Sequence, residues 1–295
     1  MSRSPVERLV EEASSRSAPV KFYASSRCPY AQRVWIGLEE KAVDYQWVEI
    51  DLYRSASAGS RGRWLMPLEE LQNLYPDFVA CSPRGLLPAL DNEGEHVYDS
   101  IVLLEYVHEI FNGPPLLPTS PLARAKVRLW SKHVDLHIVP NFERLLAAHD
   151  AEARAMARED LVQALALFEE AMSPLAKGPF FLGSDFSMAD AVLAPWWLRM
   201  CSVLRAYRKF DPSAFSRLQV WFEAVEGRPC FAKTALDPEK LIEEFSYCAD
   251  PDVEEGVRFR RGGPKSLRSR GPTEPGSRGH RISLGTMSET SSQLL

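Results

Sequence analysis

The stretch VKFYASSRCPYAQRVWIGL, residues 20–38, decides the fold of this chain. Residues 20–24 form a short run rich in β-forming side chains, which is typical of a buried strand. Pro29 suits the first position of a helix, where its missing N–H costs no hydrogen bond. Beyond it, apolar side chains recur at helical spacing at Ala31, Val34, Trp35 and Leu38. The stretch therefore predicts a strand, a tight turn, and a helix that begins directly after Cys28.

The residues that follow continue the mixture of strands and helices. Further strands are predicted over 44–50, 87–90 and 96–99. The last two flank Asn92-Glu93-Gly94, which is a turn sequence of a hairpin, and Ser100 is placed to cap the next helix. The segment 53–80 is less regular, with a Ser/Gly/Arg-rich start and a helical stretch around Pro67–Leu74. Residues 20–115 are thus interpreted as a small α/β domain.

The second half of the folded region has helical periodicity. Apolar side chains recur at Leu161, Leu165, Phe168, Met172 and Leu175, and again at Phe215, Leu218, Phe222 and Val225. Ser187 and Asp190 have the S-x-x-D spacing in which each side chain caps the other's backbone N–H at a helix start. The predicted fold class is therefore α/β plus all-α, with an all-helical domain at 116–250.

Composition bounds what the chain can do. It has 295 residues, of which 45% are hydrophobic and 25% charged, as in a globular protein with a sizeable core. The net charge of −5 argues against nucleic acid as the main partner. No window reaches the roughly 18 consecutive apolar residues of a membrane span, so no stable membrane insertion is predicted. Five scattered cysteines form neither a disulfide framework nor a metal motif, which indicates a reducing compartment, the cytoplasm.

Charge is unevenly distributed along the chain. From Pro251 onward there are eight Lys/Arg and five Asp/Glu residues, so this part carries +3 and residues 1–250 carry −8. The basic tail, 251–295, has too few apolar side chains to offset the entropy of ordering and is predicted to be disordered. A flexible segment is predicted over 1–19 as well.

Cys28 is the residue most suggestive of chemistry. At a helix start its sulfur faces unpaired backbone N–H groups and the positive end of the helix dipole, both of which favour thiolate. Such positions can lower a cysteine pKa from ~8.5 into the range ~3.5–7.5, and the thiolate is the nucleophile. Arg27 and Arg33 would add positive potential if they turn toward it. The alternative is a structural cysteine packed in the core.

The residue three positions after Cys28 is Ala31, so the chain lacks a C-x-x-C pair. Without a resolving thiol in the motif, a disulfide attacked by Cys28 would leave a mixed disulfide that needs an external thiol. The sequence therefore predicts a monothiol mechanism with a small-molecule thiol as co-substrate. Cys81 is a distant candidate for a resolving cysteine.

Two further motifs leave alternatives open. A cis bond between Leu87 and Pro88 would expose the Leu87 backbone to an extended ligand, whereas a trans proline would simply begin a strand. Asp99 and Ser100 could hold the amine and carboxylate of one ligand at a helix start, or could only cap that helix.

A possible metal motif lies in the second half. His133 and His137 are one helical turn apart, but the glutamate of H-E-x-x-H and a third ligand are missing, so a packed helix face is favoured and no metal is predicted.

Four motifs together resemble the cytosolic glutathione S-transferase superfamily, most closely its cysteine-type, omega-like class. They are SRCPYAQRV at 26–34, GLLPAL at 85–90, YDS at 98–100 and GSDFSMADAVLAPWW at 183–197. The resemblance covers roughly residues 20–247. It implies a thioredoxin-like N-terminal domain that binds glutathione, followed by an all-helical C-terminal domain, the glutathione transferase fold.

The resemblance also implies site residues. Cys28 would form the mixed disulfide with glutathione, which would be bound by Tyr30, Leu87, Pro88, Asp99 and Ser100. The family usually has Glu where this chain has Asp99, so that contact would be longer or water-mediated. Candidates for the glycyl carboxylate are Arg54, Arg61 and Arg63. Trp197, Arg199 and Trp221 match positions near the second-substrate cleft, although tryptophans at helical spacing more often belong to a core.

The activity implied by this resemblance is glutathione-dependent thiol transfer or reduction, acting on disulfides, glutathionylated substrates or dehydroascorbate. The family also implies a homodimer. One alternative is a noncatalytic adaptor of the same fold, favoured by the expanded 53–80 segment, which could obstruct the glutathione site. Another is a soluble protein that inserts into membranes, as chloride intracellular channel proteins do, but residues 29–41 carry several charges that disfavour it.

Overall fold

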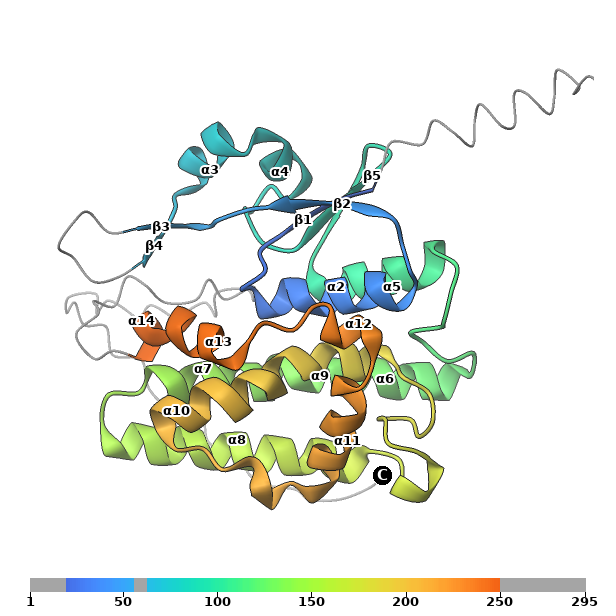
Figure 1. Cartoon of the computed structure of the whole chain (residues 1–295), viewed down its shortest axis with the longest axis vertical. Helices are drawn as coiled ribbons and strands as arrows, with labels where there is room; N and C mark the ends of the chain where they lie inside the picture. Colours follow the sequence, from blue (N-terminus) through green and yellow to red (C-terminus); the bar gives the residue numbers. More distant parts are fainter. Residues whose placement is uncertain (1–19, 56–62, 250–295) are drawn as a thin grey trace, which may run out of the picture. The chain divides into compact units, whose positions relative to one another are not determined.

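The computed structural model of the chain describes residues 20–55 and 63–249 (Figure 1). The expected flexible segment 1–19 and basic tail 251–295 lie outside the described residues. Within the described ranges, no helix combines the length and the apolar character that crossing a membrane requires.

The N-terminal half is built on a mixed four-stranded sheet in the order β2-β1-β5-β6. The strands are β1 (Val20–Ala24), β2 (Tyr45–Glu49), β5 (Ala89–Asn92) and β6 (Glu95–Tyr98). β1 runs parallel to β2 and antiparallel to β5, which pairs with β6 as a hairpin. At the hairpin turn Glu93 and Gly94 have φ values of 56° and 89°, positive as a tight two-residue turn requires. This topology confirms the expected thioredoxin-like fold.

Helices cover both faces of the sheet. They are α2 (Pro29–Glu40), α3 (Leu68–Leu74), α4 (Pro76–Cys81) and α5 (Ser100–Ile110). Figure 1 shows α2 and α5 on the side of the sheet that faces the helical half, and α3 with α4 on the other side. Gly37 lets α2 approach α5 closely, because a Cβ there would lie 2.8 Å from Cδ2 of Leu104.

The expanded segment 53–80 adds a layer of its own. A second, two-stranded sheet pairs β3 (Tyr53–Ser55) with β4 (Arg63–Leu65), and α3 follows where a helix was predicted around Pro67–Leu74. Leu71 of α3 and Phe78 of α4 form a second apolar cluster, separate from the main core. It also includes Tyr23 of β1 and Ile50, which directly follows β2. The small hairpin was not predicted, because strands of three residues carry too little alternation to be recognised.

The C-terminal half is helical throughout, as predicted. Its elements are α6 (Pro121–His133), η1 (Val134–Ile138), α7 (Val139–Ala147), α8 (Ala151–Ala171), η2 (Leu175–Lys177), α9 (Met188–Arg199), η3 (Met200–Leu204), α10 (Arg205–Arg208), η4 (Pro212–Ala214), α11 (Ser216–Glu226), α12 (Pro229–Ala232), α13 (Pro238–Glu244) and α14 (Ser246–Ala249). η1 and η3 are short π-helical segments, which often occur near functional sites. The predicted stripe on α8 is buried except for Leu175, which lies beyond the helix end and is 51% exposed.

The central helix of this half is α9, whose residues are all buried. Its start is the predicted capping box of Ser187 and Asp190. One oxygen of Asp190 accepts from the backbone N–H and hydroxyl of Ser187 at 2.8 and 2.7 Å. The other accepts from the Phe181 N–H and the Trp221 indole, both at 2.8 Å. The carboxylate therefore joins three segments of the helical half.

Replacing this carboxylate is expected to destabilise the protein strongly. Asp190→Ala leaves four buried donors without an acceptor, so we expect the free energy of unfolding to fall by about 3 kcal/mol or more. Urea unfolding followed by far-UV circular dichroism measures this. Asp185→Ala, at an exposed aspartate of the same loop, is the matched control and should change stability little. Equal effects of the two substitutions would contradict the assigned role of Asp190.

Candidate functional site

Three predicted site segments meet at one end of the strands β1, β5 and β6. Tyr23 of β1 pairs with Ala89 of β5, which in turn pairs with Tyr98 of β6. Cys28 follows β1 after a short turn, Leu87 precedes β5 by two residues, and Asp99 directly follows β6. Because paired positions lie side by side across a sheet, these segments converge on the same end of neighbouring strands.

Cys28 is the residue immediately before α2, with Pro29 at the first helical position, as predicted. Its backbone N–H donates to the Ser25 carbonyl at 3.0 Å, and its carbonyl accepts from the Gln32 N–H at 3.0 Å. The side chain is partly exposed and makes no capping hydrogen bond. The turn therefore fixes the position of the thiol at the helix start while leaving its sulfur free to react.

The protonation of Cys28 differs from the expectation. Burial raises the pKa of the Cys28 thiol above its ordinary value, and this desolvation outweighs the opposing effects. The backbone N–H groups of Ala31 and Tyr30 and the guanidinium groups of Arg199 and Arg33 each lower it. The prediction of a depressed pKa was thus wrong in its net direction, because it counted the helix dipole and not the low-dielectric surroundings.

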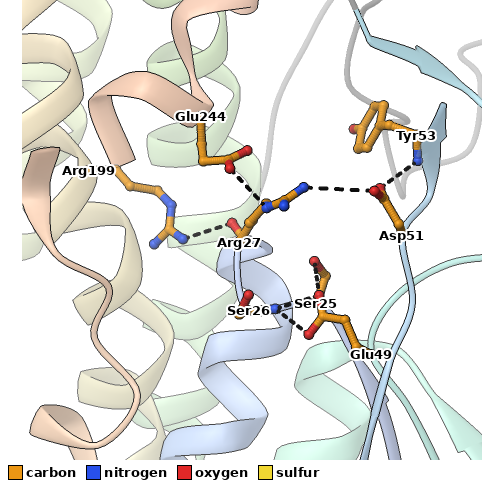
Figure 2. Close-up of polar contacts among 8 residues, drawn as sticks. All are labelled: Ser25, Ser26, Arg27, Glu49, Asp51, Tyr53, Arg199 and Glu244. Atoms are coloured by element: carbon orange, nitrogen blue, oxygen red, sulfur yellow. Dashed lines mark hydrogen bonds and ion pairs between the residues drawn. The ribbon is translucent and has the colours of Figure 1, made fainter. Parts of the chain in front are cut away.

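The turn that carries Cys28 is held from the neighbouring strand by Glu49 (Figure 2). Glu49 accepts from the Ser25 hydroxyl at 3.0 Å and from the Ser26 backbone N–H at 3.3 Å. The Trp47 indole donates to the same carboxylate at 2.9 Å. This carboxylate at the end of β2 therefore anchors the loop between β1 and α2.

Arg27, next to Cys28, is paired with acids on both halves of the protein. Its Nη1 lies 3.8 Å from Asp51 and its Nε lies 3.1 Å from Glu244 of α13, as Figure 2 shows. The side chain is about half exposed, and these ion pairs link the loop to a C-terminal helix. The cations that lower the pKa of Cys28 most are Arg199 and Arg33.

Arg33 of α2 is completely buried between the two halves. It pairs with Asp135 of η1 at 2.7 Å and donates from Nε to the Val192 carbonyl at 3.0 Å. Its Nη1 also donates to the Ser100 hydroxyl at 3.2 Å. The guanidinium of Arg33 thus connects α2, which begins directly after Cys28, with the start of α5 and with the helical half.

Leu87 and Pro88 are joined by a cis peptide bond, so the first of the two alternatives for this motif holds. Leu87 is partly exposed. Among the described residues, neither the N–H nor the C=O of Leu87 makes a hydrogen bond. An unpaired donor and acceptor on one residue beyond the end of a strand can bind an extended peptide segment.

Asp99, and not Ser100, caps α5. Asp99 has φ 84° and its Oδ1 accepts from the backbone N–H of Ile101 at 2.9 Å and of Val102 at 3.3 Å. Within the described residues its Oδ2 has no partner. Ser100 is the first residue of the helix, and its buried hydroxyl accepts from Arg33. The expectation of Ser100 as the cap was therefore wrong, while both side chains lie at the predicted helix start.

Two of the three residues expected near a second-substrate cleft lie in the helical core. Trp197 and Trp221 are buried in the helical core, where their rings meet edge to face with centroids 6.3 Å apart. Both occupy core-facing positions on α9 and α11, which is the alternative that their helical spacing had favoured over the cleft implied by the family resemblance. Arg199 is also fully buried, but it reaches toward the loop of Cys28. Tyr30 packs edge-on against Trp196 at 5.2 Å, so a contact with glutathione stays a prediction for it.

Other candidates take structural positions. Cys81 is buried with its sulfur bonded to the Leu90 carbonyl at 3.3 Å, and burial raises its pKa to about 11, so it is not placed as a resolving thiol. His133 bonds to the Ala164 carbonyl at 2.9 Å. In the described part of the chain, no group of three or more potential ligands forms a metal site.

The side chains of Arg54, Arg61 and Arg63 lie outside what the structure describes.

Sequence reasoning missed the acids and amides that hold the loop and the arginines. These are Gln32, Glu49, Asp51, Asp135 and Glu244. Glu49 had one usable signal, since a carboxylate at the end of a strand parallel to β1 would lie beside the following turn. The others depend on contacts between distant segments and carry no local pattern.

Comparison with known proteins agrees with this arrangement. The sequence model described as "Glutathione S-transferase, N-terminal domain" matches residues 27–110, and that of the C-terminal domain matches residues 151–224. Glutathione S-transferase L3 of Arabidopsis thaliana is 27% identical over 248 residues, covering 82% of this chain and 93% of the relative. Glutathione S-transferase omega-1 of Sus scrofa is 25% identical over 223 residues, covering 75% of this chain and 83% of its own.

A solved structure is similar as well. The crystal structure of glutathione transferase Omega 3C from Trametes versicolor superposes with a TM-score of 0.62 at 31% identity. The match covers 80% of this chain and 98% of that chain, so it includes both halves of the fold.

The raised pKa of Cys28 predicts a particular pH profile. Without glutathione, the rate of Cys28 alkylation by iodoacetamide should still be rising through about pH 8.5, the ordinary cysteine range, because only the thiolate reacts. Peptide mapping by mass spectrometry follows Cys28 separately from the other cysteines, with Cys28→Ser as the control for peptide assignment. A rate that is already constant from pH 6 to pH 8 would contradict the net direction of this shift.

Proposed function

Because the chain belongs to the glutathione S-transferase family, whose members use glutathione as co-substrate, we propose that it is an omega-like, glutathione-dependent thiol transferase with Cys28 as nucleophile. The observation that carries the proposal is the partly exposed thiol at the start of α2, at the same end of the strands as Leu87 and Asp99. With Ala31 at the position of a resolving cysteine, the partner thiol comes from glutathione.

Glutathione would lie across the ends of the strands β1, β5 and β6. The free N–H and C=O of Leu87 support pairing with the backbone of the cysteinyl residue, as in an added β-strand. This pairing would direct the glutathione sulfur toward Cys28, whose loop is fixed by Glu49. The cis Pro88 follows directly and belongs to the same proposed surface.

The γ-glutamyl group would be held at the start of α5. Because Arg33 donates to the Ser100 oxygen, the hydroxyl hydrogen of Ser100 remains available to a ligand carboxylate, which the helix N-terminus also favours. The free Oδ2 of Asp99 would accept from the γ-glutamyl ammonium, while its Oδ1 continues to cap the helix. The shorter Asp side chain thus serves both purposes through different oxygens.

The proposed reaction has two displacement steps. The Cys28 thiolate attacks the glutathionyl sulfur of a mixed disulfide, forms a new S–S bond, and releases the substrate thiolate, which takes up a proton. The thiolate of a second glutathione then attacks the glutathionyl sulfur, gives oxidised glutathione and restores the Cys28 thiolate. Reduction of a glutathionylated substrate thus consumes one glutathione. Reduction of a disulfide without glutathione consumes two, because the first glutathione forms the mixed disulfide and the second releases it.

Acceptors in this proposal are disulfides, glutathionylated substrates and dehydroascorbate. Conjugation of glutathione to electrophiles should be weak, since that chemistry relies on a hydroxyl that activates the bound thiol without competing for it. Here the position holds a thiol that would itself become the reactive sulfur. The chain's place in the cytoplasm stays a prediction from its composition.

The turnover of hydroxyethyl disulfide tests the proposal. With glutathione and a glutathione reductase couple, the wild-type protein should turn over, and Cys28→Ser should lose most of that activity, at least about a hundredfold, because a serine cannot form the mixed disulfide. Calorimetric glutathione binding should survive in the variant. Cys201→Ser, at another partly exposed cysteine, is the matched control and should leave turnover unchanged.

A noncatalytic adaptor is the second candidate function. The raised pKa of Cys28 favours it, since a neutral thiol is a poor nucleophile. Absence of turnover together with absence of glutathione binding in a folded wild-type protein would support the adaptor. Binding without turnover would instead exclude disulfide reduction for this substrate and leave other acceptors to be tested.

We further propose that the protein forms a homodimer, as the family commonly does. Leu122, Leu129 and Leu136 follow one another at intervals of seven on α6 and η1, so they share a helix face, and all are more than half exposed. Arg128, next to Leu129 in the sequence, forms a bidentate ion pair with Glu105 of α5 in the same chain, with hydrogen bonds of 3.0 and 2.7 Å. An apolar row next to a fixed ion pair is typical of an interface between protein chains.

A charge placed in this row should prevent dimer formation. We expect Leu129→Glu to shift the protein from dimer to monomer in sedimentation velocity, because an isolated carboxylate would be buried in the interface. Leu167→Glu, at an equally exposed leucine of α8, is the control and should leave the dimer intact. A monomeric wild-type protein, or a dimeric Leu129→Glu variant, would contradict this assignment.

A further inference from the structure

Arg199, the last residue of α9, sends a fully buried guanidinium toward the loop of Cys28. Its Nη2 donates to the Arg27 carbonyl at 3.0 Å, a contact that Figure 2 shows. Its Nη1 donates to the Gln32 side-chain oxygen and to the Pro195 carbonyl, both at 2.8 Å. The helical half thus reaches the candidate active site through one side chain.

These contacts lie on both sides of the nucleophile. Arg27 immediately precedes Cys28, and Gln32 is one helical turn after it, with its backbone N–H bonded to the Cys28 carbonyl. A planar guanidinium offers several donors in fixed directions, so it can hold two acceptors at a set separation. Arg199 therefore fixes the start of α2 and the residue before it relative to α9.

The charge of Arg199 is also unusual among the buried arginines. Arg33 has the Asp135 carboxylate at 2.7 Å, whereas no carboxylate of the described residues lies within ion-pair distance of Arg199. The Arg199 Nε is buried without a hydrogen-bond partner. A buried cation bonded only to neutral acceptors is costly, and a nearby anion offsets that cost.

Cys28 is the group that can supply such an anion. The guanidinium of Arg199 lowers the pKa of Cys28. Burial lowers the pKa of Arg199 to about 10, although Cys28 partly offsets this effect. Arg199 thus stays protonated at neutral pH. The two groups stabilise each other's charged forms across the boundary between the halves of the protein.

We propose that Arg199 is a positioning residue for Cys28: it fixes the nucleophile's turn from the helical half, and its unpaired charge is balanced when Cys28 becomes a thiolate. This inference rests on the proposed function, because it assumes that the Cys28 thiolate is the reacting species. It also assigns α9 a part in the chemistry, in addition to its place in the core.

Other charged groups near Cys28 have partners of their own. Arg33 on α2 is paired with Asp135, and Arg27 with Asp51 and Glu244. The neighbouring Tyr30 phenol is neutral, because burial raises its pKa. Among these three arginines, Arg199 is therefore the one whose positive charge depends most on the Cys28 thiolate for a nearby negative charge.

Two substitutions separate its charge from its shape. Arg199→Gln removes the charge but keeps an amide donor, and it should move the midpoint of Cys28 alkylation upward by about one pH unit, a roughly tenfold lower rate at pH 7. Arg199→Lys keeps the charge but cannot hold both acceptors in a fixed fork, so its midpoint should shift less while its thiol-transfer kcat falls. Peptide mapping of the Cys28 peptide after timed iodoacetamide treatment gives the midpoints.

Arg217→Gln is the control, because Arg217 is a largely buried guanidinium bonded to backbone carbonyls far from Cys28 in sequence and position. It should lower stability and leave the alkylation midpoint unchanged. A wild-type profile in Arg199→Gln, or equal shifts in the Gln and Lys variants, would overturn the role of the charge. If Arg199→Gln does not fold, Arg199→Lys decides, and wild-type kcat and midpoint there would overturn the proposal. Alkylation needs no glutathione, so a shifted midpoint without any turnover would refute the proposed function alone.

Discussion

Two buried guanidinium groups, those of Arg33 and Arg199, join the sheet-bearing half to the helical half at the start of α2. Arg33 reaches from α2 to Asp135 and to the Val192 carbonyl, and Arg199 reaches back from α9 to the Arg27 carbonyl. A buried charge has few arrangements in which its donors are satisfied, so these contacts limit how the two halves can pack. The position of Cys28 follows from this packing as much as from its own turn.

This packing has opposing effects on the thiol. Burial raises the pKa of Cys28, whereas the packing of α9 against α2 brings in one of the two cations that lower it, Arg199; the other, Arg33, belongs to α2 itself. An isolated helix start would give a more acidic thiol but no means to orient it or to hold its charge in a dry site.

Local patterns in the sequence predicted much of the fold and part of the site. The strand, turn and helix around Cys28 and the capping box of Ser187 and Asp190 were predicted correctly, because each depends on neighbouring residues. The partners of Arg199 and the burial of Trp197 were not, since they depend on segments more than a hundred residues apart or on which helix face meets the core. The net pKa shift of Cys28 required the whole packing arrangement, which no local motif encodes.

Above all, we propose that Cys28 carries the glutathionyl group. The most direct measurement is to treat the protein with oxidised glutathione, quench with acid, and locate the added glutathionyl mass by peptide mapping. We predict one glutathionyl group, on Cys28, which is removed when reduced glutathione is added. Modification of Cys201 or Cys248 with Cys28 unmodified, in a protein that is folded, would contradict the account.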